Sequence, residues 1–352
     1  MIGLHKTRTA IGIDVGARSI KAVQLHQSSG RYRTAAISAI PRPVADQELS
    51  GDELRELRRV LKRQGFQGRD VVLAAPDKAL LRGVFDLPRQ VSGAPVAQIA
   101  RMELARMHQV APDSFEMICW EPPSSDQPQS KMQAIAVGCP HTTANAFLDQ
   151  FEENGFNVCG LDIRSAAAAR ACAPLILAPP TITAILDVGW SATKLLLVCG
   201  GSIIYERLLM DQCLSKLISR LGEKFGLTMT AACQVLDTIG LSAAADVQEL
   251  DEQSLAVIHK IARTHFDGVL EELQAPFAYV NHQYPGDGIQ RLLLIGGGAS
   301  IAGLAPYLHE RLRIEAATAT TSDVLESAPH LLAKANHPAA TVALGLAKFT
   351  GT

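Results

Sequence analysis

The sequence carries one short pattern twice, about half a chain apart in 352 residues. In each copy an apolar run ends at an aspartate, a glycine stands two positions later, and a lysine follows in a second apolar run. Two apolar runs joined by a short glycine turn are typical of a β-hairpin. A pattern that returns after half a chain indicates a duplicated fold with one hairpin in each half. The residues are Asp14, Gly16 and Lys21 in the first copy and Asp187, Gly189 and Lys194 in the second.

The chemistry of the repeated pattern suits a bound polyphosphate. A glycine in the turn lets the backbone approach a phosphate closely, and exposed N–H groups can hold the phosphate oxygens. A carboxylate at the end of a strand can hold water bound to Mg²⁺, because magnesium keeps much of its hydration shell. We therefore expect Asp14 and Asp187 to face each other across one cleft and to hold Mg²⁺ through water when a nucleotide binds.

A third motif agrees with a nucleotide cleft. The buried-strand run Arg291–Ile295 leads into three glycines and then into an expected helix from about Ile301. A glycine loop before a helix N-terminus favours nucleotide binding, whereas the missing Gly-Lys-Ser/Thr excludes a P-loop enzyme. The candidate nucleotide-binding residues are Asp14, Gly16, Arg18, Ser19, Lys21, Asp187, Gly189, Ser191, Thr193, Gly296, Gly297 and Gly298.

Composition and charge exclude several classes of protein. The 33 basic and 35 acidic residues nearly cancel, so no net field attracts nucleic acid and no nucleic-acid partner is expected. No apolar run reaches about 18 residues, so the chain is expected to have no transmembrane segment of its own. Seven cysteines stand singly, which argues against a disulfide framework or a zinc site and indicates a cytoplasmic protein.

Other segments complete the expected architecture. The stretch 50–63 begins with a capping box, Ser50 and Glu53, which is typical of a helix start, and 70–76 has the pattern of a buried strand. The region 78–159 differs from its flanks in its pattern of expected strands and helices, and it is expected to form a compact inserted unit. The fold class is therefore α/β: a duplicated actin/hexokinase-like, ribonuclease H-like fold of two lobes, with an insertion in the first.

Several stretches together resemble the PilM family of type IV pilus assembly proteins, relatives of the cell-division protein FtsA. The resemblance runs in order from about Ala10 to Gly351 and so covers nearly the whole chain. The Asp-x-Gly pairs are shared by the wider superfamily, whereas the stretch that ends in Asp77 is more particular to PilM. The motifs are Ile-Asp14-Val-Gly with Lys21-Ala-Val, Val-Val-Leu-Ala-Ala-Pro-Asp77 with Asp86-Leu-Pro88, Leu-Asp187-Val-Gly, and Leu-Ile295-Gly-Gly-Gly before Gly303-Leu-Ala-Pro-Tyr-Leu308.

The resemblance implies a cytoplasmic adaptor that is peripheral on the inner membrane through its partners. PilM-like proteins bind the short N-terminal tail of the bitopic membrane protein PilN in a groove between the first lobe and the insertion. They also contact other ring and motor components of the pilus machine. The strand 80–87 and the helix near Met102 would line the groove, although the same residues equally suit a core. The implied partner-binding residues are Leu81, Val84, Leu87 and Met102.

The resemblance also implies the domain boundaries. Subdomain 1A corresponds to 8–77 and 160–178, and the inserted subdomain 1C to 78–159. The second lobe, 2A/2B, corresponds to 181–336. A C-terminal helical segment, 338–352, is expected to close on the first lobe.

The nucleotide cleft departs from the family pattern at several positions. Each lost hydrogen bond to a charged ligand costs about 1.5–3 kcal/mol, whereas Arg18 by itself would favour a phosphate. We therefore expect ATP with Mg²⁺ to bind weakly or not at all, and hydrolysis to be negligible. The departures are Ala17 and Arg18 in place of hydroxyl residues, Trp190 in place of a small residue, Gln212 and Cys213 in place of a glycine pair, and Cys233 and Leu236 in place of a Glu and a Lys.

Two other functions are compatible with the sequence. A phosphotransferase or ATPase of the same superfamily would need a catalytic base and a substrate pocket. We assign no residues to such a base or to such a pocket. A cytoplasmic actin-like component of a type II secretion platform would share the decayed cleft, but the absence of a transmembrane helix weakens this alternative. We interpret the chain as a binding module rather than an enzyme.

Overall fold

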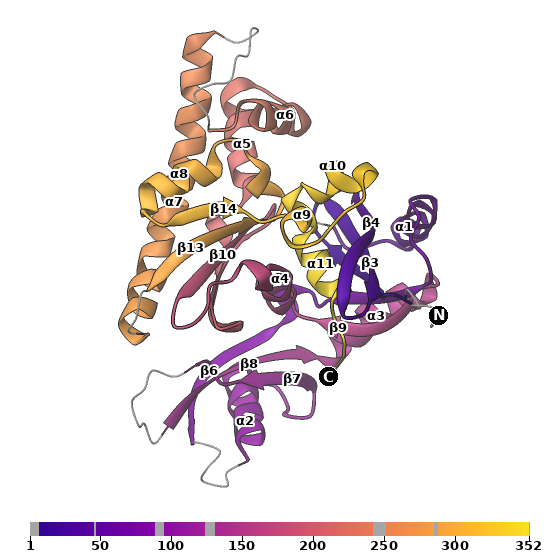
Figure 1. The fold of residues 1–352 in the computed structure, drawn as a ribbon. Helices are drawn as coiled ribbons and strands as arrows, with labels where there is room; N and C mark the ends of the chain where they lie inside the picture. The colour runs from indigo at the N-terminus through magenta and orange to yellow at the C-terminus, as the bar shows by residue number, and fades with distance from the viewer. Residues whose placement is uncertain are drawn as a thin grey trace.

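The fold is built on two β-sheets of the same design and a third, smaller sheet (Figure 1). The computed structural model describes residues 7–45, 47–88, 95–123, 131–241, 251–284 and 288–351. Thr352, the last residue of the expected closing segment, lies outside these ranges, as do parts of the expected insertion.

The first sheet contains the first copy of the repeated pattern. Its strand order is β1-β3-β2-β5-β9, and β4 pairs with β3. Helices α1 and α3 cover one face of the sheet with residues such as Leu57 and Phe151. The expected capping box of Ser50 and Glu53 at the start of α1 is confirmed. The elements are β1 (Thr7–Arg8), β2 (Ile11–Val15), β3 (Ser19–Ser28), β4 (Arg31–Pro41), α1 (Gly51–Arg63), β5 (Asp70–Ala74), α3 (His141–Glu153) and β9 (Asn157–Asp162).

The second sheet, of order β12-β11-β10-β13-β14, repeats the order β4-β3-β2-β5-β9 of the first, so each of its strands has a counterpart there. The match extends to single residues. Asp14 lies opposite Lys21 in the β2–β3 ladder, and Asp187 lies opposite Lys194 in the β10–β11 ladder. The duplicated two-lobed fold expected from the repeat is confirmed. The strands are β10 (Ile182–Val188), β11 (Thr193–Cys199), β12 (Ser202–Leu209), β13 (Ile289–Ile295) and β14 (Glu315–Thr318).

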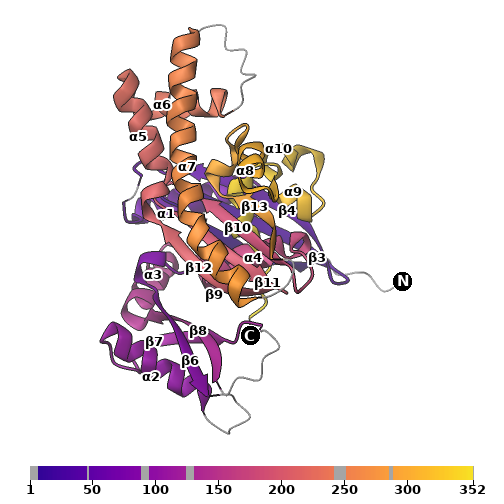
Figure 2. The same cartoon turned by 90° about the vertical axis from the view of Figure 1, so that its left-hand side faces the viewer.

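Helices α5 to α8 share one apolar core with the face of the second sheet that is turned away from α4 (Arg164–Cys172) and α11 (Thr341–Ala347). The long helix α7 runs across that sheet (Figure 2). Helix α7 continues through Pro276. A proline removes one intrahelical hydrogen bond, but Pro276 is buried together with Leu273 and Val280, and this packing offsets the loss. The helices are α5 (Leu214–Phe225), α6 (Met229–Ile239), α7 (Glu252–Gln283) and α8 (Leu304–Leu312).

Two helices, the alanine-rich α4 and α11, lie between the two sheets. They form one apolar core with the inner faces of both sheets. The helices are so close that a Cβ on Gly345 would lie 1.8 Å from the backbone oxygen of Ala167. The two helices that join the lobes therefore need a glycine at their point of contact. Two short helices precede α11 in the chain, α9 (Thr321–Val324) and α10 (Leu332–Ala335).

Between β5 and β9 the chain leaves the first sheet and forms a small sheet of order β6-β8-β7, with α2 on one face. The sequence analysis did not predict strand β7. The expected insertion 78–159 is broader than this unit, because α3 packs on the first sheet and β9 pairs with β5. The elements are β6 (Leu81–Pro88), α2 (Val96–His108), β7 (Phe115–Trp120) and β8 (Lys131–Pro140).

Replacing Gly345 by alanine tests the contact between α4 and α11. In an ordinary helix this change stabilises by about 1 kcal/mol, but here the methyl group collides with the Ala167 carbonyl. We expect Gly345→Ala to lower the free energy of unfolding, measured in urea, by about 2–3 kcal/mol. Gly268→Ala in α7 is the matched control, because its Cβ would meet only the flexible end of Gln212. Equal stability of the two variants would contradict the packing.

Candidate functional site

A cavity of about 1580 Å³ lies between the two lobes, and both copies of the repeated hairpin line it. All but one of the candidate nucleotide-binding residues line this cavity, from Asp14 in the first lobe to Gly298 in the second. The exception is Thr193, which is buried and donates its hydroxyl proton to the backbone oxygen of Gln212 at 2.6 Å. Thr193 is therefore engaged inside the second lobe and does not face the cavity.

The glycines of the two hairpins are needed for the packing of the protein itself. A Cβ on Gly16 would lie 2.9 Å from the backbone oxygen of Ser19, and one on Gly189 would lie 2.4 Å from the backbone oxygen of Ala192. The Asp-x-Gly turns therefore require glycine whether or not a phosphate binds beside them.

The glycine-rich loop also lines the cavity, but α8 does not begin there. A Cβ on Gly297 would meet nothing within 4 Å, so this residue leaves the cavity wall open. A 3₁₀ turn, Gly297–Ser300, separates the loop from Leu304, the first residue of α8. The helix expected from Ile301 thus starts later, and its first residue is not among those that line the cavity.

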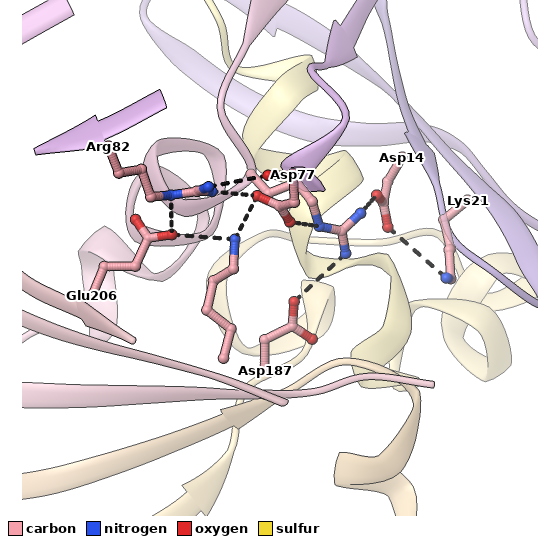
Figure 3. Close-up of polar contacts among 8 residues, drawn as sticks. Asp14, Lys21, Asp77, Arg82, Asp187 and Glu206 are labelled. Carbon is pink, nitrogen blue, oxygen red and sulfur yellow. Dashed lines mark hydrogen bonds and ion pairs between the residues drawn. The ribbon is translucent and has the colours of Figure 1, made fainter. Parts of the chain in front are cut away.

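One side of the cavity contains an arginine held by three carboxylates. Arg164, the first residue of α4, donates a hydrogen bond to Asp14, and its Nε and Nη2 atoms lie 3.4 Å from Asp77 Oδ2 and 3.6 Å from Asp187 Oδ2. Asp14 and Asp77 belong to the first lobe and Asp187 to the second. Figure 3 shows the three carboxylates turned toward one another. The two aspartates of the repeat therefore face each other as expected, with a guanidinium between them.

Further ion pairs adjoin this contact (Figure 3). Lys194 Nζ donates to Asp77 Oδ1 at 2.8 Å and lies 3.4 Å from Glu206 Oε1. Arg82 of β6 lies 2.8 Å from Asp77 and 3.3 Å from Glu206. These pairs connect the segment after β5 and the small sheet with strands β11 and β12 of the second sheet.

Burial and neighbouring charges set the ionisation of these groups. Burial alone would lower the pKa of the Arg164 guanidinium, but the three carboxylates raise it above its ordinary value, so the side chain stays charged. Burial raises the pKa of Asp77, but Lys194 and Arg164 lower it further, and the net shift is downward. Burial lowers the pKa of Lys21, and Asp14 offsets only part of that shift.

A second arginine crosses the cavity from the first lobe to the second. The Arg18 guanidinium lies over the Trp190 ring, 4.5 Å from its centroid, and Arg18 Nη1 lies 2.9 Å from Cys233 Sγ. A cation–π contact of this kind is worth about 0.5–2 kcal/mol. Arg18 thus spans the gap between the two hairpins, which is where phosphates held by both turns would lie.

Part of the cavity wall on the second lobe is apolar. Leu214 and Ile218 of α5 line it, together with Cys233 and Leu236 of α6. These four side chains offer a nucleoside few hydrogen-bonding partners, whereas Asp237, the residue after Leu236, also lines the cavity.

Two further features are absent from the part of the chain that the structure describes. There, no group of three or more His, Cys, Asp or Glu side chains is arranged to hold a metal ion. Among the described helices, not one combines the length and the hydrophobicity needed to span a membrane.

The four implied partner-binding residues do not form one surface. Leu87 is buried under α2, and Leu81 packs on the same side of the small sheet. Met102 is 54% exposed on α2, two positions from the buried Ala100 and so on the side away from the sheet. Val84 is 56% exposed on the opposite face of the sheet. Leu81 and Leu87 are therefore packing residues, which is the alternative that the sequence left open.

The sequence interpretation missed the residues that join the lobes. It contained Lys194 in the repeat without giving it a role, and it did not single out Arg164. The signal for Arg164 is weak: a charged residue opens an alanine-rich helix whose other side chains are mostly buried. Its partner Asp14 lies 150 positions away in the sequence, so no local spacing connects the two.

The two equivalent sheets, the paired hairpins and the cleft between them define an actin-like two-lobed fold. The structure of a PilM–PilN type IV pilus biogenesis complex matches with a TM-score of 0.76 and 20% identity, over 97% of this chain and 98% of that chain. The ethanolamine utilization protein EutJ of Carboxydothermus hydrogenoformans matches with a TM-score of 0.51 and 14% identity, over 99% of this chain and 91% of that chain. MreB5 of Spiroplasma citri bound to ADP matches with a TM-score of 0.53 and 14% identity, over 96% of this chain and 95% of that chain.

The family of the chain follows from its sequence. The model of the type IV pilus assembly protein PilM family matches residues 12–349. The chain therefore belongs to the PilM family, as its motifs indicate. The matched range includes both hairpins, the small sheet and the glycine-rich loop.

The Asp77–Lys194 ion pair tests how strongly charges join the lobes. Removing one partner of a buried pair leaves an uncompensated charge, so we expect Asp77→Asn and Lys194→Met each to lower the free energy of unfolding by about 3 kcal/mol near neutral pH. The double variant should lose less than both changes added together. The exposed pair Glu56–Arg63 is the control, with an expected coupling of about 0–1 kcal/mol. Additive losses at Asp77 and Lys194 would contradict the coupling.

The same pair predicts a pH dependence. The folded-state pKa of Asp77 lies below its ordinary value of 3.8, so the folded protein holds this carboxylate ionised more strongly than the unfolded chain does. Its contribution is therefore complete above that ordinary value and is lost as the pH falls through the lowered one. Urea titrations from neutral to acidic pH should show the difference between wild type and Asp77→Asn shrinking only at the acidic end.

Proposed function

We propose that the chain is a cytoplasmic actin-like adaptor of a type IV pilus inner-membrane assembly complex, held at the membrane through its partners. It binds the N-terminal cytoplasmic tail of a PilN-like bitopic membrane protein, and other ring and motor components of the pilus machine contact it elsewhere. The observation that carries the proposal is the match of the PilM family model to residues 12–349. The solved relative with the same fold over 97% of this chain is part of a PilM–PilN complex.

The small sheet offers a surface for such a tail. Helix α2 covers one face of the sheet, and the other face carries Val84 and Ile118, which are 56% and 49% exposed. Ile135 of the central strand lies beside them, since Val84 is its partner in β6 and Trp120, two residues after Ile118, is its partner in β7. Exposed apolar side chains gathered on one face mark an interaction site. We call Val84, Ile118 and Ile135 the outer face.

The outer face adjoins both lobes. On the same side of the small sheet, Val137 packs with Leu80 and Ile163 at the start of α4. The Trp120 Nε1–H donates to the backbone oxygen of Ile203 in β12 at 2.8 Å. A tail on the outer face would therefore lie beside the junction of the small sheet with the first lobe, where the resemblance implies the groove.

The nucleotide cleft supports an adaptor rather than an enzyme. The Arg18 guanidinium lies over the Trp190 ring between the two hairpins, and the Thr193 hydroxyl is engaged within the second lobe. ATP therefore binds weakly or not at all, and hydrolysis is negligible.

A fluorescent peptide with the sequence of the PilN-like tail tests the adaptor function. We expect saturable binding to the wild type, measured by anisotropy. Val84→Asp and Ile118→Asp should each weaken binding at least ten-fold, or about 1.4 kcal/mol, because a carboxylate must lose water to enter an apolar contact. Met102→Asp is the matched control, since Met102 is similarly exposed on the other side of the unit. Absence of wild-type binding would overturn the proposal, and loss in Met102→Asp alone would move the site to α2.

Calorimetry with ATP and Mg²⁺ tests the cleft separately. Micromolar affinity corresponds to about 8 kcal/mol, and we expect the wild type to fall short of it because the phosphate and nucleoside positions have lost hydrogen-bonding groups. Tight binding that requires magnesium would show that the cleft is intact.

A further inference from the structure

The position expected for Mg²⁺ is taken by a side chain. The Arg164 guanidinium lies between Asp14 and Asp187. It donates a hydrogen bond to Asp14, and its Nη2 atom lies 3.6 Å from Asp187 Oδ2. The two aspartates are only 1% and 8% exposed. Magnesium keeps several of its waters in protein sites, so a hydrated ion can reach this point only when the Arg164 guanidinium leaves it.

The charges around this point already balance. The connected ion pairs contain four carboxylates and four cationic side chains, so a divalent cation would add two uncompensated positive charges to a largely buried cluster. Uncompensated buried charge is costly. The residues of this cluster are Asp14, Asp77, Asp187 and Glu206 with Lys21, Arg82, Arg164 and Lys194.

The shape of arginine suits the task. A guanidinium is planar, always charged, and carries five N–H donors in a fixed fork, so one side chain can serve several carboxylates. Arg164 uses this geometry, because its Nη1, Nε and Nη2 atoms are directed to three carboxylates from three separate segments. Two of these segments are in the first lobe and one is in the second, so the contact closes the cleft at the point where a metal ion would bridge it.

We propose that Arg164 is the resident cation of this cleft, taking the place of a divalent metal ion between Asp14 and Asp187 and joining the lobes without metal or nucleotide. The cleft residues do not fit a magnesium ion as long as Arg164 is present. Without it, Asp14, Asp77 and Asp187 would form a set of oxygen ligands of the kind that Mg²⁺ and Mn²⁺ prefer. This inference does not depend on the identity of the pilus partner.

The substitution Arg164→Ala tests the proposal in the full chain without nucleotide. We expect the variant to be less stable than the wild type in the absence of divalent ions and to gain thermal stability on addition of millimolar Mn²⁺ or Mg²⁺. Mn²⁺ binding, followed by electron paramagnetic resonance, should be at least 100-fold tighter in Arg164→Ala than in the wild type, a difference of about 2.7 kcal/mol. The melting temperature of the wild type should not respond to either ion.

Two controls separate this role from general stabilisation. Arg170→Ala removes a cation from the same helix whose ion pair reaches a single carboxylate, Asp162, so it should lose stability without rescue by Mn²⁺. Arg164→Lys keeps a positive charge and should remain insensitive to metal. Tight Mn²⁺ binding by the wild type that disappears in Asp187→Asn would overturn the proposal, and this measurement needs no folded Arg164→Ala. Folded Arg164→Ala without any metal response would overturn it as well.

Discussion

Three carboxylates from two halves of a duplicated fold share one partly buried guanidinium at the cleft, and this contact joins the halves. Arg164 is also the first residue of α4, the helix that lies with α11 between the two sheets. The same helix therefore supplies both the central charge and part of the apolar core that the lobes share. Farther along α4, the backbone of Ala167 lies so close to Gly345 of α11 that a Cβ there would collide with it. Charge pairing and close packing thus both hold α4 in its place between the two sheets.

Much of the fold could be predicted because its signals are local. A hairpin with Asp-x-Gly is written in consecutive residues, and its return after half a chain predicts two equivalent sheets. The structure shows this equivalence down to the matching pairs Asp14–Lys21 and Asp187–Lys194. The capping box at Ser50 is equally local, since its two hydrogen bonds join residues three positions apart.

The rest depends on residues that only the folded chain brings together. Nothing near Arg164 in the sequence indicates that its partners are Asp14 and Asp187, which come from other strands and, in one case, from the other lobe. Strand β7 was missed as well, and with it Ile118, so the outer face could not be recognised as a surface. Gly16 and Gly189 were singled out because glycine lets the backbone approach a phosphate. The structure adds a second reason, since neighbouring backbone atoms leave no room for a Cβ at either position.

The place of α11 in the chain has a consequence for biosynthesis. This helix lies directly on β2, where a Cβ on Gly12 would fall 2.2 Å from the backbone oxygen of Ala343. It follows the entire second lobe in the sequence, yet it covers the inner side of the first sheet, including Val23 and Leu25. Domains usually fold as units while they leave the ribosome, but here the apolar side of the earlier sheet stays uncovered until the later lobe has been translated. The first sheet can therefore complete its core on this side only after the second lobe has been synthesised.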